Sequence, residues 1–119
     1  KFNVVDLLDL AEATAVMSLE DGWLYGTFEL AGPEALSQSE MADVISKVLG
    51  KPVRAEAIPI SIMQEKALTS GVSEDRVKQM TIMNEHYDSF GFLGNPRILA
   101  AVLGRAPTTF ETYVRRIAD

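Results

Sequence analysis

The stretch from residue 80 to residue 92 combines soft apolar, aromatic and titratable side chains. It holds the only histidine of the sequence among methionine and aromatic residues: Met80, Met83, His86, Tyr87, Phe90 and Phe92. Such residues suit an adaptable apolar pocket, into which His86 could present a polar group. They also suit plain core packing at helical spacing, with His86 meeting the negative end of a helix dipole. We take the six as substrate-pocket candidates and keep the packing interpretation beside them.

Other patterns that could carry chemistry are explained by local structure. Asp6 and Asp9 could be paired carboxylates, but their spacing at a helix start fits an N-cap and a first-turn charge. Gly32-Pro33 and the glycines at 91 and 94 are too short for a phosphate loop, and no Lys-Ser/Thr follows them. One histidine without partners rarely forms a catalytic or metal site. We therefore assign no catalytic, cofactor-binding or metal-ligating residue to this chain.

Composition excludes several function classes. The 119 residues suffice for one domain, and 17 acidic against 11 basic side chains give a net charge of −6. That sign argues against nucleic acid and against an anionic membrane surface as partners. The sequence has no cysteine, and it shows neither a secretory signal nor an apolar run near the ~20 residues that span a bilayer. We expect a cytoplasmic protein.

Helix and strand signals predict an α/β protein with two or three short strands and about six helices. Strands are expected at residues 2–5, 24–31 and 53–58, and helices at 6–19, 37–50, 61–71, 73–90, 96–104 and from 108 onward. Three S/T-x-x-E/Q capping boxes mark helix starts: Ser37 with Glu40, Ser61 with Gln64, and Thr108 with Glu111. So few strands are hard to form into a self-sufficient sheet, which suggests that another segment contributes.

Three segments resemble, in order, the NmrA-like and atypical short-chain dehydrogenase/reductases. They are Val4–Ala13 (VVDLLDLAEA), Tyr25–Ser37 with Gly50–Val53 after its helix, and Leu103–Glu111 (LGRAPTTFE). The resemblance implies the C-terminal, substrate-side part of a Rossmann-type protein that binds NAD or NADP. It also implies one domain over residues 1–119, with a strand–helix junction (1–22), a strand–helix–strand part (23–60) and a helical lid (61–119).

The nucleotide-binding features of that family are absent from the sequence. No G-x-G-x-x-G-type run occurs, so the turn that cradles the dinucleotide phosphates is missing. No lysine follows Tyr25, Tyr87 or Tyr113 by four positions, so the reductase Tyr-x-x-x-Lys pair is missing too. No cofactor is therefore expected in this chain, and NAD or NADP is implied only for a complete protein. The start at Lys1, without a methionine, suggests an excised segment.

Two functions remain open. The first is the substrate-binding and lid portion of an NmrA-like NAD(P)-dependent oxidoreductase, which is not catalytically complete alone and takes a small-molecule substrate in the complete protein. It requires two strands in an α/β arrangement between residues 28 and 58. The second is a non-catalytic binding, regulatory or dimerisation module, favoured by the missing fingerprint. We expect either self-association through the exposed apolar stretch or association with a Rossmann half.

Overall fold

The computed structural model describes residues 1–118 and divides into two compact units. The first unit contains residues 1–54 and 92–118, and the second contains residues 55–91. This division does not follow the predicted subdivision at residues 22 and 60. The assignment of the whole chain to one substrate-side domain stays a prediction.

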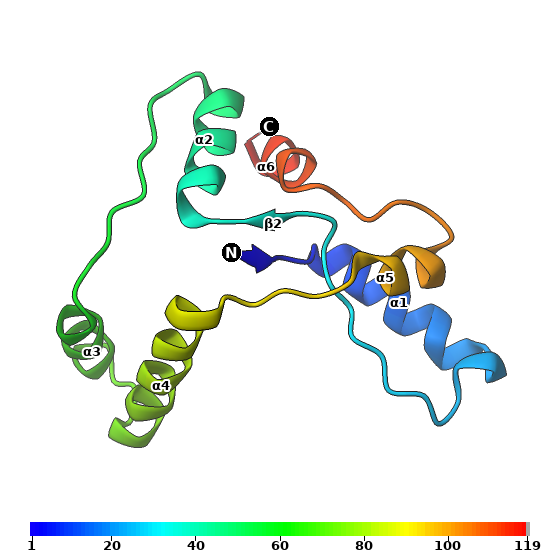
Figure 1. The fold of residues 1–119 in the computed structure, drawn as a ribbon, viewed down its shortest axis with the longest axis horizontal. Coiled ribbons are helices and arrows are strands. Elements are labelled where there is room, and N and C mark those ends of the chain that lie inside the picture. Colours follow the sequence, from blue (N-terminus) through cyan, green and yellow to red (C-terminus); the bar gives the residue numbers. More distant parts are fainter. Residues whose placement is uncertain (119) are drawn as a thin grey trace. The chain divides into compact units, whose positions relative to one another are not determined.

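The first unit combines four α-helices and a 3₁₀ helix with a minimal sheet (Figure 1). Its elements are β1 (Phe2–Asn3), α1 (Leu7–Leu19), the 3₁₀ helix η1 (Asp21–Trp23), β2 (Ala35–Leu36), α2 (Gln38–Leu49), α5 (Pro96–Leu103) and α6 (Phe110–Ala118). Strand β1 pairs antiparallel with β2, and Phe2 lies opposite Leu36. On its other side, Phe2 forms an isolated parallel bridge with Phe92. The short strand β1 is thus covered along both edges.

The core of the first unit lies where α1 packs against α5. Ala13 and Leu99 are fully buried there, and Val102 is nearly so. The small side chain of Ala13 lets the two helices approach closely, and Leu99 fills the space between them. A second contact joins α2 to α6, where Ala42 and Val114 are buried. These two helix pairs hold α1 and α6 within the first unit.

Capping residues explain most helix boundaries and confirm the corresponding predictions. The Ser37 hydroxyl accepts from the Glu40 amide at 3.2 Å, and the Glu40 carboxylate accepts from the Ser37 amide at 2.7 Å. Hydrogen bonds from Lys1, followed by those from Ser37, lower the pKa of Glu40 to about 2. Gly50 and Gly104 end α2 and α5 with φ of 62° and 65°, a left-handed conformation that suits glycine.

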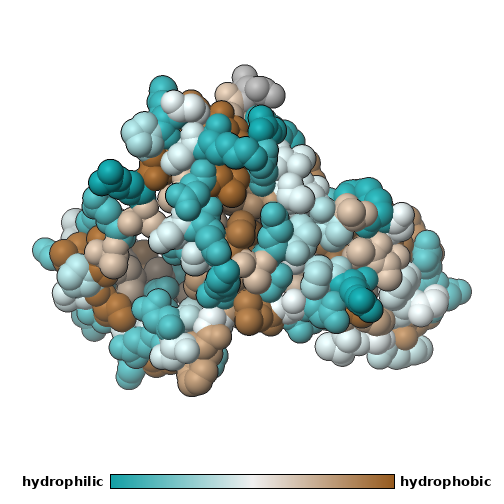
Figure 2. All heavy atoms as spheres, turned by 45° about the horizontal axis from the view of Figure 1, so that its top comes forward, coloured by the Kyte–Doolittle hydropathy of each residue, from teal (hydrophilic) through white to brown (hydrophobic). Residues whose placement is uncertain are grey.

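The second unit is a pair of helices. It consists of α3 (Ile60–Thr69) and α4 (Glu74–Phe90), which pack together. Only Val77 is buried among the residues described in this unit. The Gln64 amide donates to the Thr81 hydroxyl at 2.9 Å and so joins the two helices. Figure 2 shows brown apolar residues reaching the molecular surface in several places among teal polar ones.

The strands predicted at residues 24–31 and 53–58 are wrong, and β2 was not predicted. A strand needs the backbone of a neighbour, and within residues 1–118 neither segment pairs with one. Tyr25 takes a left-handed φ of 61°, and the rings of Trp23 and Phe28 meet edge to face at 5.4 Å, so this segment turns locally. The strand pair that the reductase hypothesis required between residues 28 and 58 is therefore absent from the described structure.

Two of the predicted capping boxes are also wrong. Helix α3 begins at Ile60 behind Pro59, without a side-chain cap, so Ser61 and Gln64 lie inside the helix. At α6 the hydroxyl of Thr109, not of Thr108, accepts from the Thr112 amide at 3.2 Å. Thr108 is instead bound to Asp9. The sequence thus placed the starts of α3 and α6 correctly to within a few residues. At α6, the bonds of Thr108 to Asp9 leave Thr109 as the residue that caps the helix.

Candidate functional site

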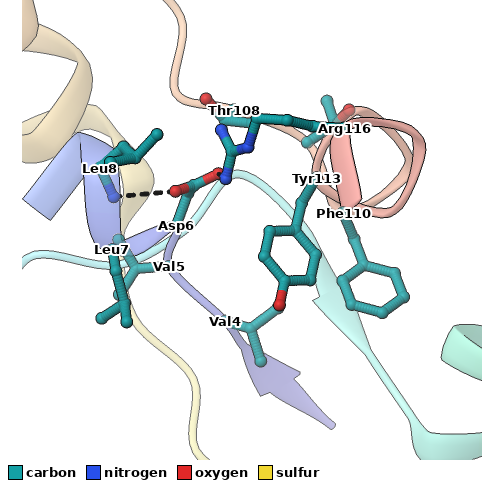
Figure 3. A pocket seen from close by; sticks show the side chains of 10 residues that line it. Val4, Val5, Asp6, Leu7, Leu8, Thr108, Phe110, Tyr113 and Arg116 are labelled. Carbon is teal, nitrogen blue, oxygen red and sulfur yellow. Dashed lines mark hydrogen bonds and ion pairs between the residues drawn. The ribbon is translucent and has the colours of Figure 1, made fainter. Parts of the chain in front are cut away.

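An apolar groove of about 540 Å³ lies in the first unit, between the start of α1 and the start of α6. We name it the α1–α6 groove. It is lined by Val4, Val5, Asp6, Leu7, Leu8, Thr108, Thr109, Phe110, Tyr113 and Arg116 (Figure 3). Its two walls come from opposite ends of the sequence, so it exists only in the folded unit.

The first wall is the segment that leads from β1 into α1. Val4 and Val5 continue the chain beyond β1, and Asp6 then caps α1 by accepting from the Leu8 amide at 2.8 Å. The cap turns the chain so that Leu7 and Leu8 remain 76% and 61% exposed. Large apolar side chains at a helix start, open to solvent, form a surface that favours being covered.

The second wall is the first turn and a half of α6. The rings of Phe110 and Tyr113 are stacked, with centroids 6.1 Å apart and an interplanar angle of 25°. Figure 3 shows the Tyr113 ring directed across the groove, with its hydroxyl beside Val4. No hydrogen bond joins this hydroxyl to another residue in the part of the chain that the structure describes. The wall thus offers flat apolar area and one hydrogen-bonding group.

An ion pair closes one side of the groove. The Arg116 guanidinium donates to Asp6 Oδ2 at 2.7 Å, and the same guanidinium lies 5.6 Å from the Tyr113 ring centroid. Asp6 therefore uses one oxygen for the helix cap and the other for Arg116. This pairing confirms the structural interpretation of Asp6 as a cap and gives it a role other than general acid–base chemistry.

Asp9 holds Thr108, one of the residues that line the groove. It is 1% exposed and accepts from the Thr108 amide at 2.5 Å, the Thr108 hydroxyl at 3.1 Å and Arg105 at 2.8 Å. Burial acts to raise the pKa of Asp9, but the hydrogen bonds from Thr108 and Arg105 outweigh it, so the pKa lies below its usual value. Arg105 also donates to Glu12 at 2.5 Å. The sequence predicted only a first-turn charge here and missed this attachment of residues 105–108 to α1.

The six substrate-pocket candidates divide between the two units. Met80, Met83, His86, Tyr87 and Phe90 lie on α4 in the second unit, whereas Phe92 lies in the first. The structure brings His86 close to Phe90, with ring centroids 4.8 Å apart, and to Tyr87 at 6.2 Å. Met83 and Phe90 are exposed. The pocket role of these residues stays a prediction, and the α1–α6 groove is built from a different set.

Few polar side chains line the groove. Its one carboxylate is neutralised by Arg116, and its remaining polar groups are hydroxyls. Among residues 1–118, no three His, Asp or Glu side chains gather in a way that could hold a metal ion. None of the described helices has the length and apolar character required to cross a membrane.

Known proteins resemble this chain over part of their length. No protein-family model matches it. The NAD(P)H azoreductase of Xenophilus azovorans is 32% identical over 120 residues, which cover 100% of this chain and 39% of the azoreductase. An uncharacterized oxidoreductase of Bacillus subtilis is 36% identical over 86 residues, covering 71% of this chain and 30% of that protein.

Solved structures share the fold at lower identity. The Citrobacter sp. triphenylmethane reductase complexed with NADP(H) matches with a TM-score of 0.78 at 21% identity, over 97% of this chain and 40% of the reductase. An NADPH-dependent quinone oxidoreductase of Escherichia coli matches with a TM-score of 0.82 at 19% identity, over 99% of this chain and 43% of that one. This chain therefore spans about two fifths of the relatives that it matches over its whole length.

The azoreductase match and the shared fold agree with the three sequence segments that resembled reductases. They support the family even though the predicted strand pair between residues 28 and 58 did not form. The chain is homologous to the C-terminal two fifths of the NmrA-like, atypical short-chain dehydrogenase/reductases.

Proposed function

We propose that this chain is the substrate-side portion of an NAD(P)H-dependent reductase and works together with a nucleotide-binding Rossmann half. The observation that carries the proposal is the 32% identity to an NAD(P)H azoreductase over the whole chain, which spans only 39% of that protein. The sequence contains no glycine-rich dinucleotide fingerprint, so nicotinamide binding belongs to the other half.

We extend the proposal to the class of substrate. The names of the relatives refer to azo compounds, triphenylmethane dyes and quinones, which are conjugated and largely apolar molecules. Hydride chemistry is supplied by the nicotinamide, so the substrate side has to bind and orient the acceptor. Two apolar surfaces suit such an acceptor, namely the α1–α6 groove in the first unit and the Met83, Tyr87 and Phe90 stretch of α4 in the second.

A second candidate function is a non-catalytic module that binds another protein or a second copy of itself. It is favoured by the exposure of large apolar side chains in both units, such as Leu7 in the first and Phe90 in the second. The two candidates differ in whether the native polypeptide binds a dinucleotide.

The proposal is tested by purifying the native polypeptide with an antibody raised against this chain. Its intact mass and its affinity for NADPH are then measured, with the 119-residue chain of 13.0 kDa as control. We expect a polypeptide roughly 2.5 times longer, in proportion to the 39% coverage of the azoreductase, that binds NADPH while the control does not. A native polypeptide that fails to bind NADPH, whether in isolation or with its copurifying partners, would refute the reductase and support the module.

A further inference from the structure

We propose that residues 27–31 form a docking strand, which pairs through its backbone with a strand of the nucleotide-binding part of the same polypeptide. The inference rests on the proposed function for the existence of that part, but the docking strand itself is identified from contacts within the first unit. The segment belongs to the cyan stretch that runs between η1 and β2 in Figure 1.

The backbone of the docking strand has no hydrogen-bond partner within residues 1–118. On one side of it the Gly26 amide donates to the Trp23 carbonyl at 3.3 Å, and on the other the Gly32 carbonyl accepts from the Asn3 side chain at 3.0 Å. Between them no backbone N–H or C=O is bonded, although Ala31 is only 5% exposed. Because buried peptide groups are almost always paired in folded proteins, this backbone indicates a partner outside the described residues.

The side chains of the docking strand are already packed on both faces. Exposure alternates from Thr27 to Leu30, and Leu30 packs against the core that contains Leu99. On the opposite face, a Cβ at Gly94 would lie 2.6 Å from the Cβ of Ala31, so the backbone at residue 94 lies directly over that face. A strand covered on both faces still pairs along its edges, as in the parallel sheets of α/β proteins. The absent partner is therefore a neighbouring strand and not a further apolar layer.

The other unbonded extended segment, residues 54–58, lacks these properties. All five of its residues are exposed, so neither of its faces is packed within the chain. Exposed backbone is hydrogen-bonded to water and needs no protein partner. The contrast distinguishes residues 27–31 as the docking strand and makes residues 54–58 a control segment.

The length of the relatives identifies the partner of the docking strand. This chain spans 40% of the triphenylmethane reductase and 43% of the quinone oxidoreductase, and it shares their fold over 97% and 99% of its own length. Its unpaired backbone thus belongs to a fold of which about three fifths lies outside this chain. A Rossmann-type half contains an open, mostly parallel sheet, to which a strand can be added at an edge.

A second copy of this chain suits the docking strand less well. Each copy carries a net charge of −6, which opposes association. A two-fold symmetric antiparallel pair centred on the segment would also set Glu29 opposite its own equivalent. Like charges directly opposite each other destabilise a strand pair, so the partner is a different strand.

The test is hydrogen exchange followed by mass spectrometry on the complete polypeptide, at high and at low protein concentration. We expect the amides of residues 27–31 to exchange at least about a hundredfold more slowly than in an unstructured peptide at both concentrations, and those of residues 54–58 to exchange freely. Exchange of residues 27–31 as fast as that of residues 54–58 would overturn the docking strand. Protection that disappears on dilution would identify a second copy as the partner and would also overturn the proposal.

Two variants at one position separate the backbone from the side chain. Glu29→Pro and Glu29→Ala both remove the carboxylate, but only proline removes the backbone N–H. In the complete polypeptide, Glu29→Pro should accelerate exchange of the remaining amides of the docking strand about tenfold, the effect of one hydrogen bond, and Glu29→Ala should not. Equal exchange rates in the two variants would contradict pairing through the backbone.

The two proposals fail separately. Free exchange of residues 27–31 in a polypeptide that binds NADPH would reject the docking strand and leave the reductase assignment standing. Slow exchange of these residues in a longer polypeptide that does not bind NADPH would reject the reductase and leave the docking strand. A native polypeptide of only 119 residues would overturn both.

Discussion

Asp9 joins α1 to residues 105–108 in the first unit. It is fully enclosed and satisfies the Thr108 amide, the Thr108 hydroxyl and the Arg105 guanidinium at once. A buried carboxylate is tolerated only with such partners, and removal of its charge leaves those partners unpaired. The residue therefore fixes where the wall of the groove at residue 108 lies relative to α1.

Replacing Asp9 with asparagine should lower the free energy of unfolding by about 2 kcal/mol, because bonds to a buried charged acceptor are lost. Urea denaturation followed by circular dichroism measures the change. The matched control is Glu12→Gln, which removes the other partner of Arg105 at a half-exposed position and should cost under about 0.5 kcal/mol. Equal losses in the two variants would contradict the role given to Asp9.

The same residue predicts a dependence of stability on pH. The pKa of Asp9 is lower in the folded chain than its ordinary value of 3.8, so the folded state binds the proton less readily than the unfolded state does. Its contribution is therefore complete above pH ~4 and is lost as the pH falls through the folded pKa. Unfolding free energies measured from pH 6 to pH 2 should converge for the wild type and Asp9→Asn at the acid end, and a constant gap would contradict this.

The backbone at Gly32 lies close to the backbone at Val4, which leaves no room for a side chain. A Cβ at this position would lie 1.6 Å from the Val4 carbonyl oxygen, and neither backbone can yield without disturbing the start of the first wall. Gly32→Ala should cost about 3 kcal/mol in a thermal or urea melt, in the range of severe overpacking. Gly22→Ala, where a Cβ meets nothing within 4 Å, is the control and should be nearly neutral.

At the scale of elements, helices were predictable from sequence because their boundary signals are local. Ser37 with Glu40, Asn95 before Pro96 and Gly104 each act within a few residues, and the structure confirms all three. The predicted strands failed because a strand is completed by a neighbour. Tyr25 and Phe28 have strand propensity, but nothing among the described residues pairs with them. The strand propensity of these residues thus indicated that they could pair with a strand, but it did not show that a partner strand was present.

The groove was missed for a related reason. Leu7 was correctly assigned to a helix, and Val4 was assigned to a strand that in fact ends at Asn3. No local signal in the sequence shows that Tyr113 lines the same groove as these two residues. The partners of the first helix lie about a hundred residues away, as in the bonds of Asp6 with Arg116 and Asp9 with Arg105. Sequence periodicity marks an apolar face without indicating which distant element meets it.

The extended segments should behave as unpaired backbone in the chain on its own. Residues 27–31 and 54–58 donate no backbone hydrogen bond in the described structure, whereas α2 is regularly bonded. Hydrogen exchange followed by NMR should show rapid exchange of those amides and slow exchange in α2. Strong protection of residues 27–31 in the isolated chain would show that a strand partner exists within it.

At the scale of the molecule, the two units differ in how much they bury. The first has a core around Ala13, Leu99 and Val102, while the second has Val77 as its one buried residue among those described. Little apolar area removed from water means little stability, so the helix pair α3–α4 should be the weaker unit.

Native-state hydrogen exchange at low urea should therefore open α3 and α4 before α1 and α5. Val77→Ala should accelerate exchange in the second unit alone, and Val102→Ala should lower the stability of the first. Identical opening free energies for both units would contradict their independence.

The ion pairs that join the start of α1 to Arg105 and Arg116 can form only after those arginines have been synthesised. Asp6 is separated from Arg116 by 110 positions, and Asp9 from Arg105 by 96. At about 5–20 residues per second, α1 leaves the ribosome roughly 5–20 s before its partners exist. During that interval Asp6 and Asp9 lack their arginine partners, and the exposed Leu7 and Leu8 lack the facing wall of α6. Although α1 precedes the other helices of this segment, it is thus among the last of them to be secured.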